Sequence, residues 1–179
     1  MARKGDVLEN PVTGERVIFL ETRESSNNQL LRMEAFNLAD GFNRVYHIHP
    51  TQEERHEVIE GIMGIKAGGK EHVLNPSEIF TFPNDVPHKF WNISGKDIHF
   101  LTEFRPAYDT EGFIETYFRI AQAGKANEKG QPPLFHFFVL LNHYPIAGYL
   151  AGVPISIQRV FISIMAFIGR LLGYKPTQD

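Results

Sequence analysis

The stretch of sequence from His47 to Gly61 reads HIHPTQEERHEVIEG. It holds three histidines and four glutamates in fifteen residues, yet the runs HIH and HEVI alternate like half-buried β-strands. Alternate side chains of a strand share a face, so His47 lies with His49, and Glu54 lies with His56 on the next strand. Ionisable residues at positions that should face a core indicate a chemical site inside the fold.

Short segments around this stretch have the composition of β-strands, because they are rich in β-branched and aromatic residues and end at Gly, Pro, Asn or Asp. The expected strands are residues 16–22, 30–38, 44–49, 55–69, 70–74, 77–83, 88–94 and 97–106. Residues 30–38 also suit a helix by composition, and residues 6–16 are expected to form a loop or arm. Short strands at this regular spacing predict a mostly β protein, a sandwich or a barrel.

The pattern changes after the last expected strand. Residues 109–124 predict a helix that is closed by a glycine. Residues 134–152 and 154–173 are apolar segments that we also expect to be helical. The sequence therefore predicts two domains, a β-barrel over residues 1–107 and a helical extension over residues 108–179.

Composition narrows the function. The net charge of −3 provides no basic field for nucleic acid, so no nucleic-acid partner is expected. The chain has no cysteine, which excludes disulfides, thiolate metal ligands and a cysteine nucleophile. The polar run DVLENPVTGE follows the basic start MARKG where a secretory signal would be apolar, and we expect a cytoplasmic protein.

A further histidine, His88, opens another expected strand about thirty residues after Glu54. If the strands are neighbours, three imidazoles and one carboxylate converge. Two histidines and a carboxylate with open positions suit Fe(II), while Zn, Mn, Ni and Cu also accept imidazole and carboxylate oxygen. The sequence thus suggests a site for one divalent transition metal.

The spacing of these residues resembles the first motif of the cupin superfamily, G-x5-H-x-H-x4-E-x6-G. All its fixed positions are matched, by Gly41, His47, His49, Glu54 and Gly61.

The second cupin motif, G-x5-P-x-G-x2-H-x3-N, is matched in part. Pro83, His88 and Asn92 stand at its fixed positions, whereas Ser77 and Asp85 replace its two glycines. Ser and Asp also form turns, so the site is still expected. The resemblance is to small bacterial single-domain cupins, including those that begin NPVTGER, and it covers roughly residues 10–107.

The resemblance implies a jelly-roll barrel, or double-stranded β-helix, around one divalent metal. The implied ligands are His47, His49, Glu54 and His88, and the family's metals include Fe, Mn, Ni, Zn and Cu. Its members include dioxygenases, isomerases, decarboxylases, lyases and non-catalytic binding proteins.

Strand phase predicts the lining of the pocket. Val45 should face inward with the first two histidines, Val58 with Glu54, and Phe90 and Asn92 with His88. Such an apolar lining favours a small apolar or aromatic ligand.

His56 shares the inner face but lies outside the ligand pattern of the family. It could orient a ligand, act as a catalytic acid or base, or only line the wall.

Three functions remain open at this point. The first is a metal-dependent oxidoreductase, similar to a dioxygenase, acting on an apolar molecule. The second is a non-catalytic cupin that binds or senses a small molecule. The third is a metal-dependent isomerase or lyase in which His56 transfers the proton.

The segment 154–173 has apolar residues at helical, amphipathic spacing. Three interpretations follow: it packs on the barrel or on the partner of a homodimer, it inserts into a membrane interface as a peripheral anchor, or it forms a lid over the site. We expect a homodimer.

Overall fold

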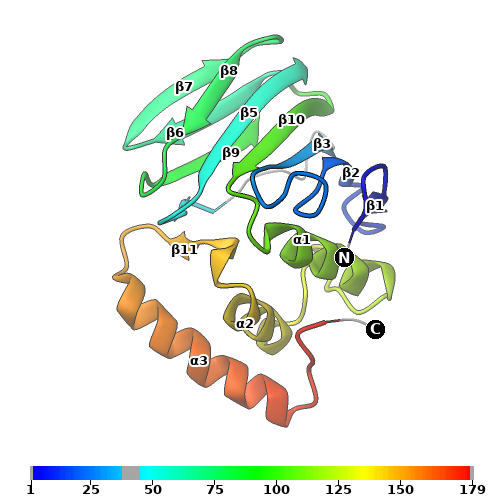
Figure 1. The fold of residues 1–179 in the computed structure, drawn as a ribbon, viewed down its shortest axis with the longest axis vertical. Helices are drawn as coiled ribbons and strands as arrows, with labels where there is room; N and C mark the ends of the chain where they lie inside the picture. The colour runs from blue at the N-terminus through cyan, green and yellow to red at the C-terminus, as the bar shows by residue number, and fades with distance from the viewer. Residues whose placement is uncertain (1, 38–44, 178–179) are drawn as a thin grey trace.

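The computed structural model describes residues 2–37 and 45–177, with the exception of the side chain of Ala147. Two antiparallel sheets face each other as a jelly roll, and helices follow at one end of it (Figure 1). Gly41, the first residue of the first motif, lies outside the described residues. The mostly β architecture with a helical extension confirms the predicted fold class.

The first sheet has the strand order β1-β2-β3-β10-β5-β8. Its strands are β1 (Val7–Glu9), β2 (Arg16–Glu21), β3 (Leu31–Asn37), β10 (Ile98–Arg105), β5 (Glu53–Glu60) and β8 (Ile79–Phe82). The second sheet has the order β11-β4-β9-β6-β7. Its strands are β11 (Tyr149–Leu150), β4 (His47–Ile48), β9 (His88–Asn92), β6 (Met63–Ala67) and β7 (Lys70–Leu74).

Alternation along the strands sets what lies inside. In β3, every second residue from Leu31 to Asn37 is buried, while Arg32 and Glu34 are only partly buried. In β5, the buried residues are Glu54, His56 and Val58, as the strand phase predicted. The core between the sheets is filled mainly by aromatic and branched side chains such as Phe19, Met33, Ile65, Phe82 and Phe100.

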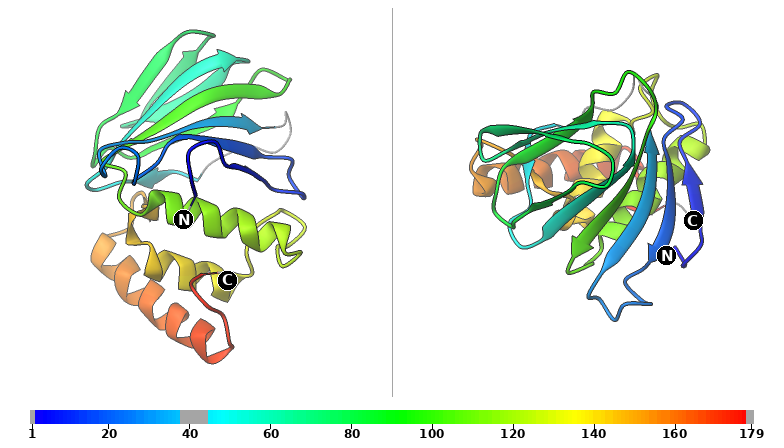
Figure 2. Two further views of the ribbon diagram at one scale, coloured as in Figure 1. Left: turned by 45° about the vertical axis from the view of Figure 1, so that its right-hand side comes forward. Right: turned by 90° about the horizontal axis from the view of Figure 1, so that it is seen from above.

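The extension contains α1 (Thr110–Gln122), α2 (Leu134–His143), the 3₁₀ turn η1 (Pro145–Ala147) and α3 (Ile155–Leu171). The helices are layered beneath the barrel, with α1 nearest to it and α3 outermost (Figure 2). Within the described residues, no helix is long and apolar enough to cross a membrane.

Two expectations about local structure are wrong. Residues 6–16 were expected to be a loop, but β1 forms there because it pairs with β2. Residues 134–152 were expected to be helical throughout, but Pro145 ends α2 and the chain continues into β11, which pairs with β4. The helical extension therefore contributes a strand to the second sheet of the barrel.

Ser77 and Asp85, which replace the two motif glycines, have φ angles of 71° and 62°. Both therefore adopt the left-handed conformation that glycine favours. The amide of Ser77 donates to the carbonyl of Val58 at 2.8 Å, and the amide of Asp85 donates to the carbonyl of His49 at 2.8 Å. These turns are kept without glycine because backbone hydrogen bonds hold them.

Replacing Ser77 by glycine should relieve backbone strain. Left-handed backbone costs an L side chain about 1–2 kcal/mol, which the entropy of glycine in the unfolded chain offsets by about 0.5–1 kcal/mol. We expect Ser77→Gly to have a free energy of unfolding about 1 kcal/mol above that of Ser77→Ala, measured by urea denaturation.

Lys70 provides the control, because it is exposed on β7 and its φ is not in the left-handed region. There the order should reverse, with Lys70→Gly less stable than Lys70→Ala by about 0.5–1 kcal/mol. A Ser77→Gly variant that is less stable than Ser77→Ala would contradict the interpretation.

Candidate metal centre

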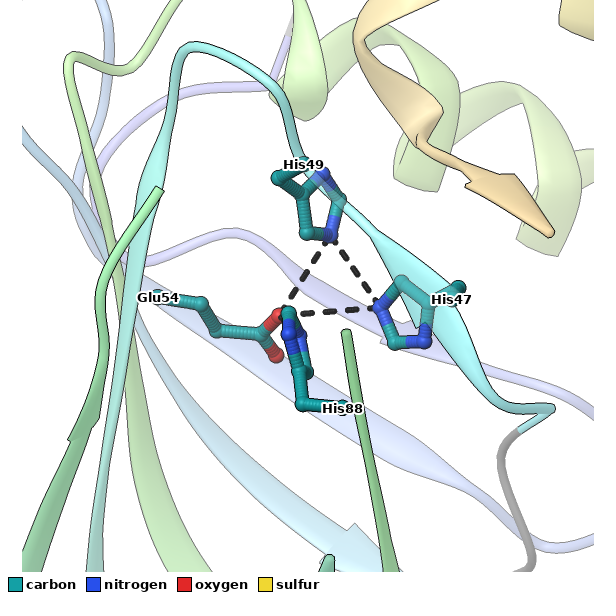
Figure 3. Close-up of side chains that lie close together, drawn as sticks. All are labelled: His47, His49, Glu54 and His88. Atoms are coloured by element: carbon teal, nitrogen blue, oxygen red, sulfur yellow. Dashed lines mark hydrogen bonds and ion pairs between the residues drawn. The ribbon is translucent and has the colours of Figure 1, made fainter. Parts of the chain in front are cut away.

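The inner faces of both sheets supply the ligands that the sequence predicts. His47 lies in β4 and pairs directly with His88, the first residue of β9. His49 follows β4, and Glu54 comes from β5 in the opposite sheet. The four side chains point toward one another between the sheets (Figure 3).

The donor atoms of this cluster are close together. The Nε2 atoms of His47 and His49 are 3.2 Å apart. Oε2 of Glu54 lies 3.0 Å from Nε2 of His88, 3.4 Å from that of His49 and 3.8 Å from that of His47. One donor atom of each residue lies within 4.8 Å of all the others.

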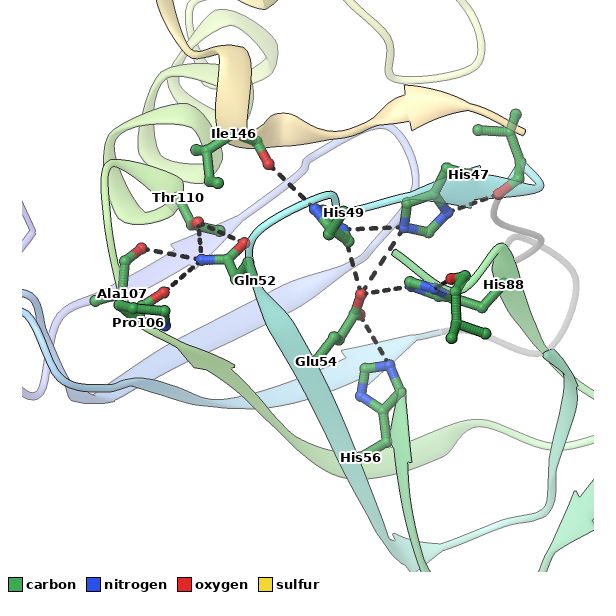
Figure 4. A network of polar contacts seen from close by, with 12 residues as sticks. His47, His49, Gln52, Glu54, His56, His88, Pro106, Ala107, Thr110 and Ile146 are labelled. Carbon is green, nitrogen blue, oxygen red and sulfur yellow. Dashed lines mark hydrogen bonds and ion pairs between the residues drawn. The ribbon is translucent and has the colours of Figure 1, made fainter. Parts of the chain in front are cut away.

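The other ring nitrogen of each ligand histidine faces a backbone carbonyl. Nδ1 of His47 lies 2.9 Å from the carbonyl of Val45, and Nδ1 of His88 lies 2.8 Å from that of Val86. Nδ1 of His49 lies 3.1 Å from the carbonyl of Ile146 in η1 (Figure 4). A carbonyl only accepts, so each Nδ1 must donate and each neutral ring presents the lone pair of Nε2 to the cluster.

These residues fit a divalent transition metal. Ligand bonds of about 2.1 Å put neighbouring donor atoms about 3.0–3.4 Å apart in octahedral or tetrahedral geometry, and the measured separations scatter around that range. Neutral imidazoles oriented by carbonyls, together with one carboxylate, are ligands that Fe, Zn, Mn, Ni and Cu accept. The cluster therefore has the composition and spacing of a metal site.

The charges of the metal-free cluster are coupled. Burial acts to raise the pKa of Glu54, but its contacts with the surrounding imidazoles outweigh burial and hold that pKa well below its ordinary value. Burial lowers the pKa of His47. Burial also opposes a charge on His88, yet its hydrogen bond to Glu54 raises the pKa of His88. Without metal, Glu54 therefore favours its ionised form, and His88 keeps its second proton to a higher pH than an ordinary imidazole does.

His56 faces inward, as predicted, but lies on the other side of Glu54 from the ligand histidines (Figure 4). Its Nε2 is 3.0 Å from Oε1 of Glu54. The angles do not make this contact a hydrogen bond, and neither ring nitrogen has a hydrogen-bond partner among the described residues. The ring is fully buried and packs against Phe82, Phe90 and Phe100. A catalytic role for His56 stays a prediction.

The four residues predicted to line the pocket do not share one environment in the structure. Val58 and Phe90 are buried in the core between the sheets. The inward orientation predicted for Val45 is wrong, because the residue precedes β4 and is 65% exposed. Asn92 lies at the end of β9, where its side chain donates to the carbonyl of Lys96 and accepts from the amide of Ser94. Asn92 therefore holds the turn after β9.

The helical extension reaches the metal centre, which the sequence did not predict. It supplies the Ile146 carbonyl to His49, and β11 runs beside β4 with Leu150 opposite His47. Gly148, at φ 100°, approaches so closely that a Cβ atom there would lie 3.2 Å from Cε1 of His49 and 3.3 Å from Cδ2 of His47. A backbone carbonyl and a close glycine leave no side-chain pattern by which sequence reasoning could find them.

Gln52 forms a second connection between the barrel and the helical extension that the sequence did not predict. Its amide is buried and donates to the carbonyl of Pro106 at 2.7 Å and to Oγ1 of Thr110 at 2.8 Å. It thereby ties the turn between His49 and Glu54 to the start of α1 (Figure 4).

A separate hollow of about 580 Å³ includes Arg16, Phe36 and His99 in its lining, and it shares no residue with the metal cluster. Within it, His99 stacks on Phe36 at 4.2 Å, and its Nε2 lies 3.3 Å from Glu34. His99 therefore lies outside the metal centre, and the hollow is not evidence about metal chemistry.

Comparison with known proteins agrees with this geometry. Residues 36–103 match the family model described as a cupin domain. No curated protein matches the sequence.

Several solved structures are similar to the barrel. A predicted oxalate decarboxylase from Thermotoga maritima has a TM-score of 0.50 at 16% identity, over 59% of this chain and 98% of that chain. An RmlC-like cupin from Shewanella frigidimarina has a TM-score of 0.49 at 19% identity, over 61% and 90%. A sugar phosphate isomerase from Silicibacter pomeroyi has a TM-score of 0.44 at 23% identity, over 51% and 59%. At these identities the likeness concerns the fold alone.

Replacing Gly148 by alanine should weaken metal binding, because the added Cβ displaces the rings of His49 and His47. Changes in groups that orient ligands cost about 10–100-fold in metal affinity, and we expect a loss in that range for Zn²⁺, measured by competition with a chelator.

Gly152→Ala is the matched control. Gly152 also has a positive φ, of 82°, but a Cβ there meets nothing within 4 Å. Both variants place a side chain at a positive φ, and only Gly148→Ala should lose affinity. Equal Zn²⁺ affinities in the two variants would show that the extension does not support the site.

Metal affinity should fall as the pH is lowered. A metal must displace the proton of His88, whose pKa is raised, so the proton competes below that pKa and not above it. We expect the Zn²⁺ affinity to be level at high pH and to drop about tenfold per pH unit once the pH is below the pKa of His88. Chelator competition between about pH 8 and pH 5 measures this, and a flat profile would contradict the proton assignment.

Proposed function

Since residues 36–103 match the model of a cupin domain, we propose that their histidine and glutamate cluster binds one divalent transition metal and that the chain is a metal-dependent oxidoreductase. The substrate that we propose is a small apolar or aromatic molecule. One observation supports the metal proposal most directly: backbone carbonyls orient all three imidazoles. As a result, three Nε2 lone pairs and one carboxylate are directed at one point.

The ligand set favours Fe(II) within this proposal, because imidazole and carboxylate ligands with open positions are the usual surroundings of non-haem Fe(II). When bound, such a metal supplies positions at which O₂ and an organic substrate can meet. The protein holds the ligands: Glu54 contributes the negative charge, and the three histidines contribute neutral donors. His47, the most exposed ligand at 15% of its side chain, marks the side from which a small molecule can approach.

The surroundings of the cluster support an apolar substrate. Phe82 stacks on His88 with ring centres 4.3 Å apart, and Phe104 lies edge-on to His49 at 6.0 Å. Aromatic walls exclude water and interact well with apolar rings. A charged sugar substrate would need cationic or hydrogen-bonding partners, whereas these neighbours of the ligands are aromatic rings.

One observation favours a second candidate, a metal-dependent isomerase or lyase. His56 is a buried imidazole without a hydrogen-bond partner among the described residues, 3.0 Å from the carboxylate that would bind the metal. Such a group could take up a proton through Glu54 in a reaction that needs no O₂. The two candidates differ in their need for oxygen and for a redox-active metal.

Loading the metal-free protein with Fe(II) in the absence of air tests both parts of the proposal. We expect about one Fe(II) per chain, and O₂ uptake when air is admitted with one or more members of a panel of phenols and small diketones. His49→Ala and Glu54→Gln should each lose the metal and the O₂ uptake, because the first removes a nitrogen donor and the second removes the negative charge of the cluster. Elemental analysis and an oxygen electrode give the two readouts.

His72→Ala is the control, since it removes an exposed histidine on β7. It should keep both metal and activity. Unchanged metal content in both ligand variants would exclude the site. Stoichiometric metal without O₂ uptake for any member of the panel would exclude the oxidoreductase and leave the metal site in place.

A further inference from the structure

Helix α3 directs its large apolar side chains away from the rest of the molecule. Within the described residues 155–172, eight apolar side chains between Ile157 and Leu172 are 37–72% exposed. Their spacing places them on one continuous side of the helix, which we call the apolar face of α3. α3 is the outermost layer of the extension, so most of this face is uncovered, although Phe161 at its border lies edge-on to Phe138 of α2 at 5.3 Å (Figures 1 and 2). These eight side chains do not pack on the barrel of their own chain, and the packing on a dimer partner that we also expected stays a prediction.

The opposite side of α3 is the side that packs, and Ile155, Ile162 and Met165 are partly buried there. Its buried residues are Gln158, Ala166 and Gly169. A Cβ atom on Gly169 would lie 2.7 Å from the carbonyl oxygen of Phe135 in α2, so the two helices approach closely there. α3 therefore lies on α2 through a narrow stripe.

The amide of Gln158 fixes the rotation of α3 about its own axis. It accepts from the amide of Leu150 at 2.9 Å and donates to the carbonyls of Leu150 and Val153 at 2.9 and 2.8 Å. Rolling the helix to bury its apolar face would leave this buried amide and the backbone groups unpaired, which is costly. The outward direction of the apolar face is thus built into the fold.

The last fifty residues, which include α3, are more basic than the rest of the chain. Residues 130–179 contain Arg159, Arg170 and Lys175, and their one acidic side chain is that of Asp179. This segment carries +2, so the rest of the chain carries −5, since the total is −3. Arg159 and Arg170 are eleven residues apart, about three helical turns, and lie on the same side of α3, separated from the apolar face by serines. Arg159 also donates to the hydroxyl of Tyr149 at 3.0 Å. An apolar face flanked by cations is the pattern of a helix that lies on an anionic lipid surface.

A second copy of the chain fits this face less well. In a two-fold pair of antiparallel helices, the same edge of each helix meets its counterpart, so the arginines of one copy would lie beside those of the other. In the described part of this segment, residues 130–177, no side-chain carboxylate could neutralise them. Lipid phosphates supply the negative charge that a second copy lacks.

We propose that the apolar face of α3 binds the surface of an anionic phospholipid bilayer. The helix has 17 residues, about 25 Å of length, and it lies along the interface with its apolar side chains among the acyl chains. Arg170 and Lys175 face the phosphate groups. The metal centre stands away from the lipid, because α1 and α2 lie between the barrel and α3 (Figure 2).

Flotation of the full chain with lipid vesicles tests the proposal. We expect it to float with phosphatidylcholine vesicles that contain about 30% phosphatidylglycerol, and to bind pure phosphatidylcholine much more weakly. Binding should weaken with salt, because phosphate attraction is screened. The double variant Val160→Glu with Ile164→Glu should lower the partition coefficient at least about tenfold, since both side chains are more than half exposed and would leave the acyl region.

Arg170→Glu with Lys175→Glu separates the charge contribution from the apolar one. Each cation contributes about fivefold near an anionic surface, so this variant should lose binding to the anionic vesicles and show little salt dependence. The matched control places glutamates at two exposed apolar positions of the barrel, Val73→Glu with Ile79→Glu, which should float like the unmodified chain. Thermal unfolding checks that every variant is folded.

Three results would overturn the proposal. The first is that the unmodified chain does not float with anionic vesicles at low salt. The second is a light-scattering mass of a dimer that Val160→Glu with Ile164→Glu converts to a monomer, without flotation of either protein, since a second copy would then cover the face. The third is equal loss of flotation in the barrel control.

Discussion

The carboxylate of Glu54 is a buried negative charge, and the arrangement of the barrel interior follows from it. A buried charge is stable only when counter-charge and hydrogen-bonding groups surround it. Here β4 and β9 bring His47, His49 and His88 to one side of it, while His56 approaches from the other. The contacts hold the pKa of Glu54 well below its ordinary value, despite burial.

The helical extension belongs to this arrangement, although it follows the barrel in sequence. The Ile146 carbonyl orients His49, and Gln52 ties the loop between two ligands to the start of α1. β11 completes the edge of the second sheet beside β4. A boundary near residue 107 separates strands from helices, but the support of the metal centre crosses it.

The packing of α3 shows that an amphipathic pattern does not by itself say which side of a helix is buried. The wide apolar side of a surface helix ordinarily faces the protein core. In α3 the close approach to α2 at Gly169 and the hydrogen bonds of Gln158 favour the narrow side instead. The apolar side is left outward, with arginines beyond the serines that border it. The apolar side chains whose spacing predicts the helix point away from the protein, and they therefore form a surface that can bind a partner.

By itself, the sequence determined the jelly roll and the four candidate ligands, because alternation along strands and motif spacing are local properties. His47 with His49, and Glu54 with His56, share faces by a period of two that holds in any strand. The same reasoning failed for Val45, where the strand had not begun, and for Asn92, whose side chain turns to the next loop.

Only the tertiary structure decided what orients the ligands and which side of α3 is covered. The carbonyl that holds His49 lies 97 residues away along the chain, and every residue has such a carbonyl, so no side-chain pattern could identify it. The direction of α3 depends on its close contact with α2 at Gly169 and on the hydrogen bonds of Gln158 to the β11 region. Periodicity encodes which residues share a face, whereas the partner of that face is set by long-range packing.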